Sequence, residues 1–446
     1  MKTAANGVIG VVGLGRSGAE AVRFLARLGQ PVLAWDEKPL GAGVRDLADL
    51  PGVTLHQGPL ERTALAGCRE ILLSPGIPRR HPALAGLNPI NDVEFLHWHV
   101  RDCGQGALFA GITGANGKST VTSLLGAMAV AAGRAMGLGG NLGPPALSLW
   151  DPTLEGYILE LSSFQLESIR EFRPRVGVFL NLTPDHMDRY PDLDGYRRAK
   201  ERIFMNQGPG DVAVVNADDP ETQRWPVPAG VRVMPFSLGA DCPGGVHFRD
   251  GHLVESLAGR SVPLLAEDDI LLVGRHNRAN AAAATAAALA LDFPREAIVR
   301  TLTTFGGLEH RMQLVGTVDG IRFFNDSKGT NVGAVVASLA GFDRDVVLIA
   351  GGRDKKGDFG PLAEAVQGRV VAAVLIGEAA DDLERALGPV TRVVRAASMQ
   401  EAVHAARGLA SAGGTVLLSP ACASFDMFAN FEDRGRQFRD VVHGLQ

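Results

Sequence analysis

The feature that most constrains the fold is a repeated alternation of short apolar runs with helical patterns. Glycine or polar residues bound each run, which is typical of strands buried on both faces of a parallel sheet. Helical patterns such as Gly18–Leu28 and Thr120–Ala132 lie between many of the runs. Strands that alternate with helices predict the α/β class with mostly parallel sheets. The predicted strands are Val8–Val12, Val32–Trp35, Ile71–Leu73, Leu108–Ile112, Tyr157–Leu161, Val176–Leu182, Val212–Val215, Val346–Ala350, Val371–Ile376 and Thr415–Leu418.

The length of 446 residues predicts about three domains, because one domain ordinarily holds roughly 100–200 residues. Polar residues at His97–Gly106 mark the first break. Phe305–Leu308 marks the second, after the helical stretch Arg295–Thr303. The predicted domains are residues 1–98, 99–306 and 307–446. Glycine, proline and short alternating segments predict antiparallel hairpins at the edge of the middle domain, between Val227 and Glu267.

Charge and composition exclude several classes of function. The net charge is only −5 and no basic run appears, so the electrostatic footprint of a nucleic-acid-binding protein is missing. The start lacks the apolar core of a signal peptide, and Ala279–Leu291 is too short for a bilayer, which needs about 20 residues. The four cysteines form no CxxC pair, so neither a zinc site nor a disulfide framework is indicated. We expect a cytoplasmic protein that binds small molecules and no membrane.

A first glycine-rich turn, GLGRSG at residues 13–18, follows a predicted strand and opens a predicted helix, and Asp36 ends the second strand. This is the context of a dinucleotide fingerprint. A helix N-terminus offers free N–H groups and about half a positive charge, so it can bind a diphosphate. Three interpretations stay open: NAD, the diphosphate of a UDP-sugar, or a purely structural turn.

A second glycine-rich turn, GITGANGKST at residues 111–120, also lies between a strand and a helix. Its backbone N–H groups can surround phosphates, Lys118 can reach the terminal phosphates, and Ser119 can hold Mg²⁺. The turn departs from G-x-x-x-x-G-K-[ST], because Ile112 stands where the first glycine belongs. The form TGxNGKST is nonetheless highly specific for phosphate binding.

Polar side chains follow the next predicted strands. Glu160 ends one strand, and Asp185 and His186 follow another. The carboxyl ends of strands in an open parallel sheet line one crevice, so these groups can converge beside the second glycine turn, where a carboxylate is a natural Mg²⁺ ligand. By composition alone, Lys200 in YRRAK is an ordinary solvated helix lysine.

The last third of the chain carries three further polar sets at predicted strand ends, which favours a crevice over a solvated face. The sets are His310-Arg311, Asp326 to Asn331 (DSKGTN), and Gly351 to Lys355 (GGRDK).

These motifs, in this order, resemble the Mur ligases. The segments that carry the resemblance are TGANGKST, ELSSFQLE, NLTPDHMDRY, the YRRAK lysine, HNRAN, EHRMQ, NDSKGTN and SPACASFDMFANFEDRG, and they span essentially the whole chain. The compact GLGRSG start resembles the members that add D-glutamate, and the DNPR tetrapeptide of diamino-acid addition is absent. The resemblance implies a Rossmann-like UDP-binding domain, a central ATPase domain and a Rossmann-like C-terminal domain for ATP and the amino acid.

The resemblance also implies roles for individual residues. The resemblance implies that the catalytic residues are Lys118, Glu160, His186 and Lys200, with Lys200 carbamylated. It also implies that two Mg²⁺ ions are held by Ser119, Glu160, His186 and the Lys200 carbamate. ATP is bound by Gly114, Asn116, Gly117, Lys118, Ser119, Thr120, Asn277, Asn280, Arg311, Asp326 and Lys328. UDP-N-acetylmuramoyl-L-alanine is bound by Leu14, Arg16, Ser17, Asp36, Gly76, Asn141 and His186. D-glutamate is bound by Thr330, Lys355, Ser424 and Phe431.

Three positions depart from the family pattern. Gly329 stands where relatives often carry alanine, Lys355 and Lys356 compete for one role, and Arg16 is bulky for a small polar position.

The implied reaction is ATP-dependent amide formation through an acyl phosphate, in cytoplasmic peptidoglycan synthesis by a monomer. Three alternatives stay open: a sibling ligase with another amino acid, an NAD-dependent dehydrogenase, and a phosphate-loop switch that uses ATP only to change conformation.

Overall fold

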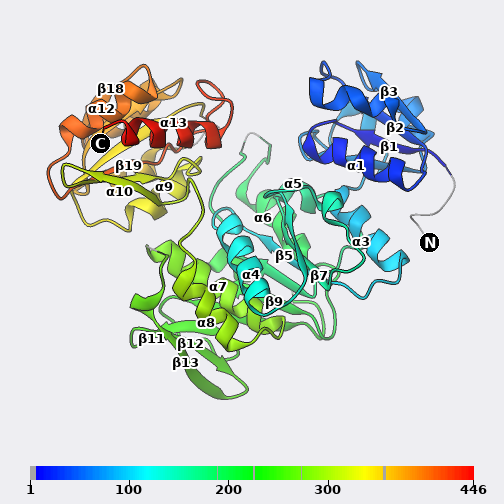
Figure 1. The fold of residues 1–446 in the computed structure, drawn as a ribbon, viewed down its shortest axis with the longest axis horizontal. Coiled ribbons are helices and arrows are strands. Elements are labelled where there is room, and N and C mark those ends of the chain that lie inside the picture. Colours follow the sequence, from blue (N-terminus) through cyan, green and yellow to red (C-terminus); the bar gives the residue numbers. More distant parts are fainter. Residues whose placement is uncertain (1–6, 188, 225–226, 273, 355–357, 446) are drawn as a thin grey trace.

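The computed structural model describes residues 7–187, 189–224, 227–272, 274–354 and 358–445. The chain forms three α/β domains, each built on its own sheet. The N-terminal domain (upper right) and the C-terminal domain (upper left) both lie above the central domain in Figure 1. All ten predicted strands are present, which confirms the α/β class. None of the helices in the described ranges is long and apolar enough to cross a membrane.

The N-terminal sheet is entirely parallel, in the order β3-β2-β1-β4. Its strand order reverses between β1 and β4, so the carboxyl ends of these two strands flank a crevice, the usual ligand site of such sheets. The elements are β1 (Ile9–Val12), α1 (Arg16–Arg27), β2 (Val32–Asp36), η1 (Ala42–Asp49), β3 (Val53–Gln57), α2 (Arg62–Ala66), β4 (Glu70–Leu73) and η2 (Pro82–Leu84).

The central sheet has the order β13-β12-β11-β10-β9-β8-β5-β7-β6. It is parallel from β6 to β11, and β12 and β13 add an antiparallel edge. The hairpins predicted between Val227 and Glu267 are therefore present, except that β10 pairs parallel with β9. The strands are β5 (Leu108–Thr113), β6 (Met136–Gly140), β7 (Gly156–Glu160), β8 (Val176–Phe179), β9 (Val212–Asn216), β10 (Arg232–Ser237), β11 (Val246–Arg249), β12 (His252–Leu257) and β13 (Arg260–Ala266).

Helices cover this sheet on both faces. The alanine-rich α7 is buried along Ala281–Ala288 because its small side chains let it pack closely against α4 and the sheet. The helices are α4 (Lys118–Ala131), η3 (Ala146–Leu149), α5 (Ser163–Leu166), α6 (Leu193–Glu201), η4 (Arg202–Phe204), η5 (Pro220–Gln223), η6 (Glu267–Asp269), α7 (Arg275–Ala290) and α8 (Arg295–Thr304).

The C-terminal sheet has the order β14-β15-β19-β16-β17-β18 and is parallel except for β14. Since β19 lies between β15 and β16, the loops after these three strands meet at one edge. The elements are β14 (Gln313–Val318), β15 (Ile321–Asn325), α9 (Val332–Leu339), β16 (Val346–Gly351), α10 (Gly360–Val366), β17 (Val370–Ile376), α11 (Ala380–Leu387), β18 (Arg392–Arg395), α12 (Met399–Leu409), β19 (Thr415–Leu418) and α13 (Phe431–His443).

The first predicted domain limit, between residues 98 and 99, falls inside the helix α3 (Asp92–Asp102). Phe95 and Trp98 of this helix belong to one hydrophobic cluster that contains side chains from both the N-terminal and the central sheet. The buried Glu94 carboxylate accepts N–H bonds of 2.7–3.0 Å from three successive residues, Arg170 to Phe172. A packed helix therefore joins the first two domains, and the exact limits of the domains stay a prediction.

Candidate functional site

The second glycine turn connects β5 to the N-terminus of α4, as predicted. Gly117 caps α4 with φ +83°, a left-handed conformation that favours glycine. A β-carbon at this position would also collide with the side-chain amide of Asn280 on α7. Gly117 is thus fixed by both its backbone and its neighbour, and the first N–H groups of α4 point into the loop.

Two lysines lie against the phosphate loop. The Lys118 ammonium donates to the carbonyl oxygens of Gly114 and Ala115, both at 2.8 Å. The Lys200 amine on α6 donates to the same Gly114 carbonyl at 2.7 Å. The loop therefore gathers two amines from different elements at the end of β5.

Glu160, at the end of β7, is buried beside this loop. Its carboxylate accepts from the Ser119 hydroxyl and from the Asn141 amide, both at 2.6 Å. Burial opposes its ionisation, but Lys118 and these two hydrogen bonds outweigh that effect and lower the pKa of Glu160. The site thus contains an ionised carboxylate in contact with the loop serine.

The C-terminal domain completes this group, because the Arg311 guanidinium donates to the Ser119 hydroxyl at 2.7 Å. Arg311 is partly buried and also lies near Glu160. One loop serine therefore contacts a carboxylate of the central domain and an arginine of the C-terminal domain.

Lys200 is not a solvated helix lysine, and the interpretation from composition alone is wrong. The residue is 1% exposed, and its amine lies 4.5 Å from the ring centroid of Tyr196. Burial and the nearby Lys118 charge hold the pKa of Lys200 well below its ordinary value. Its amine is therefore disposed to be unprotonated, which carbamylation requires.

His186 lies in the loop after β8 with φ +57°, which is uncommon for a residue other than glycine. Its Nε2 is 3.7 Å from the Asp185 carboxylate, and its ring packs edge-on against Phe164 at 4.9 Å. His186 lines the same cavity as the phosphate-loop residues Asn116 to Lys118.

These side chains line one cavity of about 260 Å³, called the catalytic cavity below. It contains the predicted residues Asn116, Gly117, Lys118, Asn141, Glu160, His186, Lys200, Arg311, Lys328 and Thr330.

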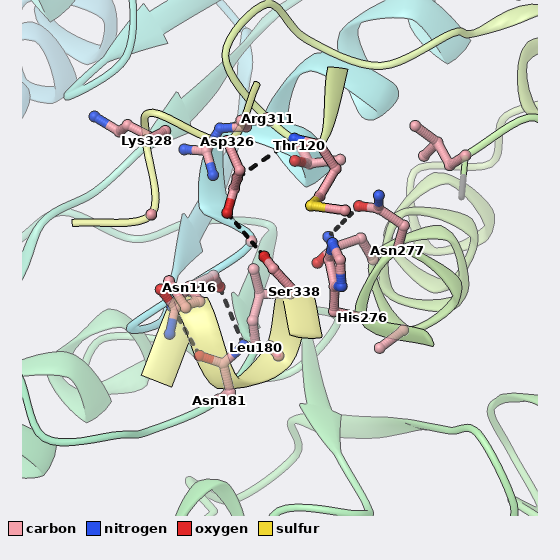
Figure 2. Close-up of a pocket in the computed structure, with 18 of the residues that line it drawn as sticks. Asn116, Thr120, Leu180, Asn181, His276, Asn277, Arg311, Asp326, Lys328 and Ser338 are labelled. Carbon is pink, nitrogen blue, oxygen red and sulfur yellow. Dashed lines mark hydrogen bonds between the residues drawn. The ribbon is translucent and has the colours of Figure 1, made fainter. Parts of the chain in front are cut away.

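A second cavity of about 250 Å³, called the nucleotide cavity below, is also lined by residues of the phosphate loop. Figure 2 shows His276 and Asn277 of α7 facing Arg311, Asp326 and Ser338 of the C-terminal domain. Thr120 and Asn280 also line it, and Asn116, Gly117, Arg311 and Lys328 line both cavities. All the predicted ATP residues except Gly114 and Ser119 therefore line one or both of two cavities at the junction of two domains.

The pKa of Asp326 is raised and the pKa of Lys328 is lowered. Burial raises the pKa of Asp326 to about 6, although the Ser419 and Ser338 hydroxyls donate to its carboxylate at 2.7 and 2.8 Å. Burial and Arg311 lower the pKa of Lys328 to about 8. The Lys328 amine lies 3.7 Å from the ring centroid of Phe431.

The residues predicted to bind D-glutamate are only partly brought together. Thr330 lines the catalytic cavity, whereas Ser424 and Phe431 are not among its lining residues. Phe431 adjoins the cavity through its contact with Lys328. Lys355 and Lys356 lie outside the described residues.

The first glycine turn is held by Asp36, whose carboxylate accepts the Leu14 N–H at 2.6 Å. Arg16 points away from the turn and donates to the Gly143 carbonyl of the central domain at 2.8 Å. Ser17 lies beside a space of about 10 Å³ next to Ser74, and Gly76 follows β4. Leu14 and Gly76 thus lie on the loops that follow β1 and β4, Arg16 and Ser17 begin α1, and Asp36 ends β2. Asn141 and His186 lie in the catalytic cavity.

Mg²⁺ fits this donor set only together with ATP. Among the described residues, no three His, Cys, Asp or Glu side chains come close enough to hold a metal alone. Mg²⁺ usually binds through one or two carboxylates plus substrate phosphates. Ser119 and the ionised Glu160 meet that need at the loop.

Three arginine or asparagine residues in the recognised motifs received no role from the sequence. Arg189 donates to the Pro75 carbonyl at 3.2 Å and so fixes the loop after β4. The fully buried Arg434 donates to Ser327, Cys422 and Gly351, one residue from each loop at the edge of the C-terminal sheet. Asn331 joins two domains and is treated below. Their motifs were visible, but these roles depend on partners far away in the sequence.

The protein has three α/β domains, and an arginine of the last domain completes the phosphate loop of the central one. This arrangement defines a class of ATP-dependent enzymes in which two domains share the nucleotide site. Family models match the chain in series: the N-terminal domain of MurD-like Mur ligases at residues 7–91, the Mur ligase middle domain at 112–288, and the glutamate ligase domain of Mur ligases at 310–422. The chain belongs to the Mur ligase family.

Individual relatives agree. A protein of Methylococcus capsulatus named UDP-N-acetylmuramoylalanine--D-glutamate ligase is 43% identical over 441 residues, which cover 98% of this chain and 94% of that protein. A protein of the same name from Chromohalobacter salexigens is 42% identical over 446 residues, with 96% and 95% coverage.

Solved structures share the fold at lower identity. A pseudomurein peptide ligase type C from Methanothermus fervidus is 18% identical with a TM-score of 0.64, over 99% of this chain and 100% of that one. MurF from Acinetobacter baumannii is 19% identical with a TM-score of 0.62, over 97% and 90%. Since the family model for the N-terminal domain covers the first glycine turn, the dehydrogenase interpretation is set aside.

Proposed function

We propose that this chain is an ATP-dependent ligase that joins D-glutamate to UDP-N-acetylmuramoyl-L-alanine and releases ADP and phosphate. The observation that carries the proposal is the Glu160–Ser119–Arg311 group at the phosphate loop, with Lys118 and Lys200 beside it. It concentrates the charges that phosphate transfer needs within one cavity, and the D-glutamate-adding relatives supply the substrates.

In the first step, the L-alanyl carboxylate attacks the γ-phosphate of ATP in line, and ADP leaves. A carboxylate cannot react directly with an amine because oxide is a poor leaving group, whereas phosphate is a good one. Lys118, Arg311 and the loop N–H groups offset the charge on the transferring phosphate oxygens. Ser119 and Glu160 would hold Mg²⁺ together with ATP, and the bound ion would supply further positive charge there.

In the second step, the uncharged amine of D-glutamate attacks the acyl carbon. The nitrogen of the tetrahedral intermediate loses a proton, the bond to phosphate breaks, and the phosphate leaves with the electron pair and takes up a proton, so that the amide remains. Thr330 and Lys328 come from the C-terminal domain and face the cavity. That domain therefore closes the site and excludes water, which would otherwise hydrolyse the acyl phosphate.

Lys200 is proposed to be carbamylated. The modification converts a buried amine into an anionic oxygen ligand, and His186 and Lys200 would then hold a second Mg²⁺ ion beside the one at Glu160. The depressed pKa of Lys200 supports this proposal because only a neutral amine reacts with carbon dioxide. A carbamate would also remove the unfavourable burial of a lysine charge next to Lys118.

The N-terminal domain is proposed to bind the UDP part of the substrate. The N-terminus of α1 and the carboxyl end of β4 flank the reversal in strand order, where the N–H groups of the first glycine turn can bind a diphosphate. Arg16 links that turn to the Asn141–Gly143 loop, and Asn141 in turn contacts Glu160. The two substrate sites are thus joined by a short path of contacts.

The decisive experiment measures ADP, phosphate and amide product with UDP-N-acetylmuramoyl-L-alanine across D-glutamate, L-glutamate, L-alanine and a diamino acid. We expect product and phosphate in equal amounts with D-glutamate only. Preference for another amino acid would assign the chain to a sibling reaction. Phosphate release that ignores the amino acid would favour a conformational switch and refute the ligase proposal.

The cellular setting is proposed from the same relatives. An enzyme of this reaction supplies a peptidoglycan precursor in the cytoplasm and so supports cell-wall growth, cell shape and division. We expect a monomer. Sedimentation at assay concentration measures this.

A further inference from the structure

Asn331 connects the C-terminal domain to the phosphate loop. It caps α9, with its side-chain oxygen accepting the Ala334 N–H at 2.8 Å. Its amide nitrogen donates to the Asp185 carboxylate at 3.1 Å and to the Asn116 side chain at 3.4 Å. Both ends of one amide are therefore used, one within its own domain and one across the domain junction.

The orientation of this amide is fixed by its partners. A backbone N–H needs an acceptor and a carboxylate needs a donor, so the oxygen must face Ala334 and the nitrogen must face Asp185. Aspartate or serine can replace asparagine as a cap, but neither offers an N–H group to Asp185. The two functions of Asn331 can therefore be separated by substitution.

The partners of Asn331 are elements of the reaction site. Asn116 belongs to the phosphate loop, and its backbone N–H donates to Asn181 in the loop after β8 at 2.9 Å. Asp185 precedes His186 and lies close to Lys200. Asn331 thus contacts the phosphate loop and the His186 turn at once.

The surrounding packing shows how closely the two domains meet at this point. Gly333, in the first turn of α9, lies so near Thr183 that a β-carbon would come within 2.9 Å of the threonine hydroxyl. Asn331 and its neighbour Thr330 both line the catalytic cavity. The position of Asn331 therefore sets where Thr330 stands relative to the phosphate loop.

We infer that Asn331 is a positioning residue that fixes the amino-acid site of the C-terminal domain relative to the phosphate loop. In this position the acyl phosphate reacts with the amine faster than with water. The inference rests on the proposed ligase function. A hydrogen bond to a charged group is among the stronger ones in proteins, and its loss displaces Thr330 without touching the nucleotide directly.

The test compares Asn331→Ser and Asn331→Asp with the wild type. Both variants keep a capping oxygen for α9 and lose the N–H donor, and the aspartate adds repulsion toward Asp185. We expect the KM for D-glutamate to rise about 10-fold to 100-fold. We also expect more than one phosphate released per amide formed, with the larger excess in Asn331→Asp. The KM for the UDP substrate should change little.

A matched control is Ser398→Ala, which removes the cap of α12 in the same domain, where Ser398 accepts the Glu401 N–H at 3.1 Å. We expect it to lower thermal stability and to keep one phosphate per amide. If both Asn331 variants keep that ratio and the wild-type KM for D-glutamate, the inference is wrong. If the wild type itself makes no amide with D-glutamate, the proposed function fails instead.

Discussion

The two glycine-rich turns of this chain share a fold position and differ in what surrounds them. Each connects the first strand of a parallel sheet to a helix N-terminus, at a reversal in strand order. At the first turn, the Asp36 carboxylate takes up the Leu14 N–H. At the second, two amines, a buried carboxylate and an arginine from another domain converge.

The comparison shows that the glycines of each turn leave space for a phosphate, whereas the surrounding side chains determine whether that phosphate is only bound or also transferred. The first helix begins with Arg16, which is directed away to Gly143. The second begins with Lys118 and Ser119, which stay at the loop. The first turn is therefore suited to hold a diphosphate unchanged, and the second to stabilise a phosphate that is being transferred.

The largest effect is expected at Lys118. In Lys118→Ala, the transferring phosphate loses a positive charge inside a low-dielectric cavity, so turnover should fall at least about 100-fold. Binding of the UDP substrate, measured by calorimetry, should stay unchanged because the first turn is intact. Near-normal turnover would contradict the proposal that the first turn only binds phosphate and the second turn stabilises the phosphate that is transferred.

Lys200→Ala should lose most activity, and added bicarbonate should not restore it, because no amine remains to be carbamylated. Isotopically labelled carbon dioxide should give a carbamate carbon signal in the wild type and none in the variant. Arg198→Ala, at a largely exposed position of the same helix, is the control and should stay active. Full activity of Lys200→Ala would contradict a role for this lysine at the second turn.

Gly18→Ala tests whether close packing at Gly18 stabilises the first turn. Its β-carbon would collide with the Gly13 carbonyl oxygen, so we expect a loss of about 3 kcal/mol of unfolding free energy in denaturant titrations. Gly15→Ala is the matched change, since the nearest atom to its β-carbon is the Ser74 hydroxyl at 4.0 Å. Gly15→Ala should leave the free energy of unfolding almost unchanged and weaken only the binding of the UDP substrate. Equal stability of the two variants would remove the packing argument.

The smallest effect concerns pH and the acid that lies beside Arg311. The pKa of Asp326 is raised to about 6, from 3.8 in the unfolded chain. Its contribution to stability is therefore complete below pH 3.8 and lost as the pH rises through 6. Relative to Asp326→Asn, the wild type should lose about 2 kcal/mol of unfolding free energy between pH 4.5 and 6.5. A difference that does not vary with pH would contradict the raised pKa.

Much of the fold follows from local sequence, and four of the five strands that escaped prediction share a physical cause. β3, β6, β14 and β18 are all edge strands, and edges are less buried and less apolar than central strands. β6 is additionally glycine-rich, with the sequence MGLGG. Interior strands with continuous apolar runs were recognised. The fifth unpredicted strand, β15, is interior, but the exposed Arg322 interrupts its apolar run.

The site was predictable where a motif carries its own chemistry, as in the phosphate loop and Glu160. From residue types alone, without the family resemblance that singled out Lys200, it was not predictable where a role depends on a distant partner. Lys200 gains its meaning from burial against Gly114, and Asn331 from Asp185 in another domain. Such partners are set by how the domains pack, which no local pattern records.

One isotope measurement tests the central claim that the second turn transfers phosphate to a substrate carboxylate. UDP-N-acetylmuramoyl-L-alanine labelled with ¹⁸O in its terminal carboxylate is converted with ATP and D-glutamate, and the released phosphate is analysed by mass. An acyl phosphate requires one labelled oxygen to pass into phosphate for each amide formed. Phosphate without label, at normal product yield, would contradict the mechanism.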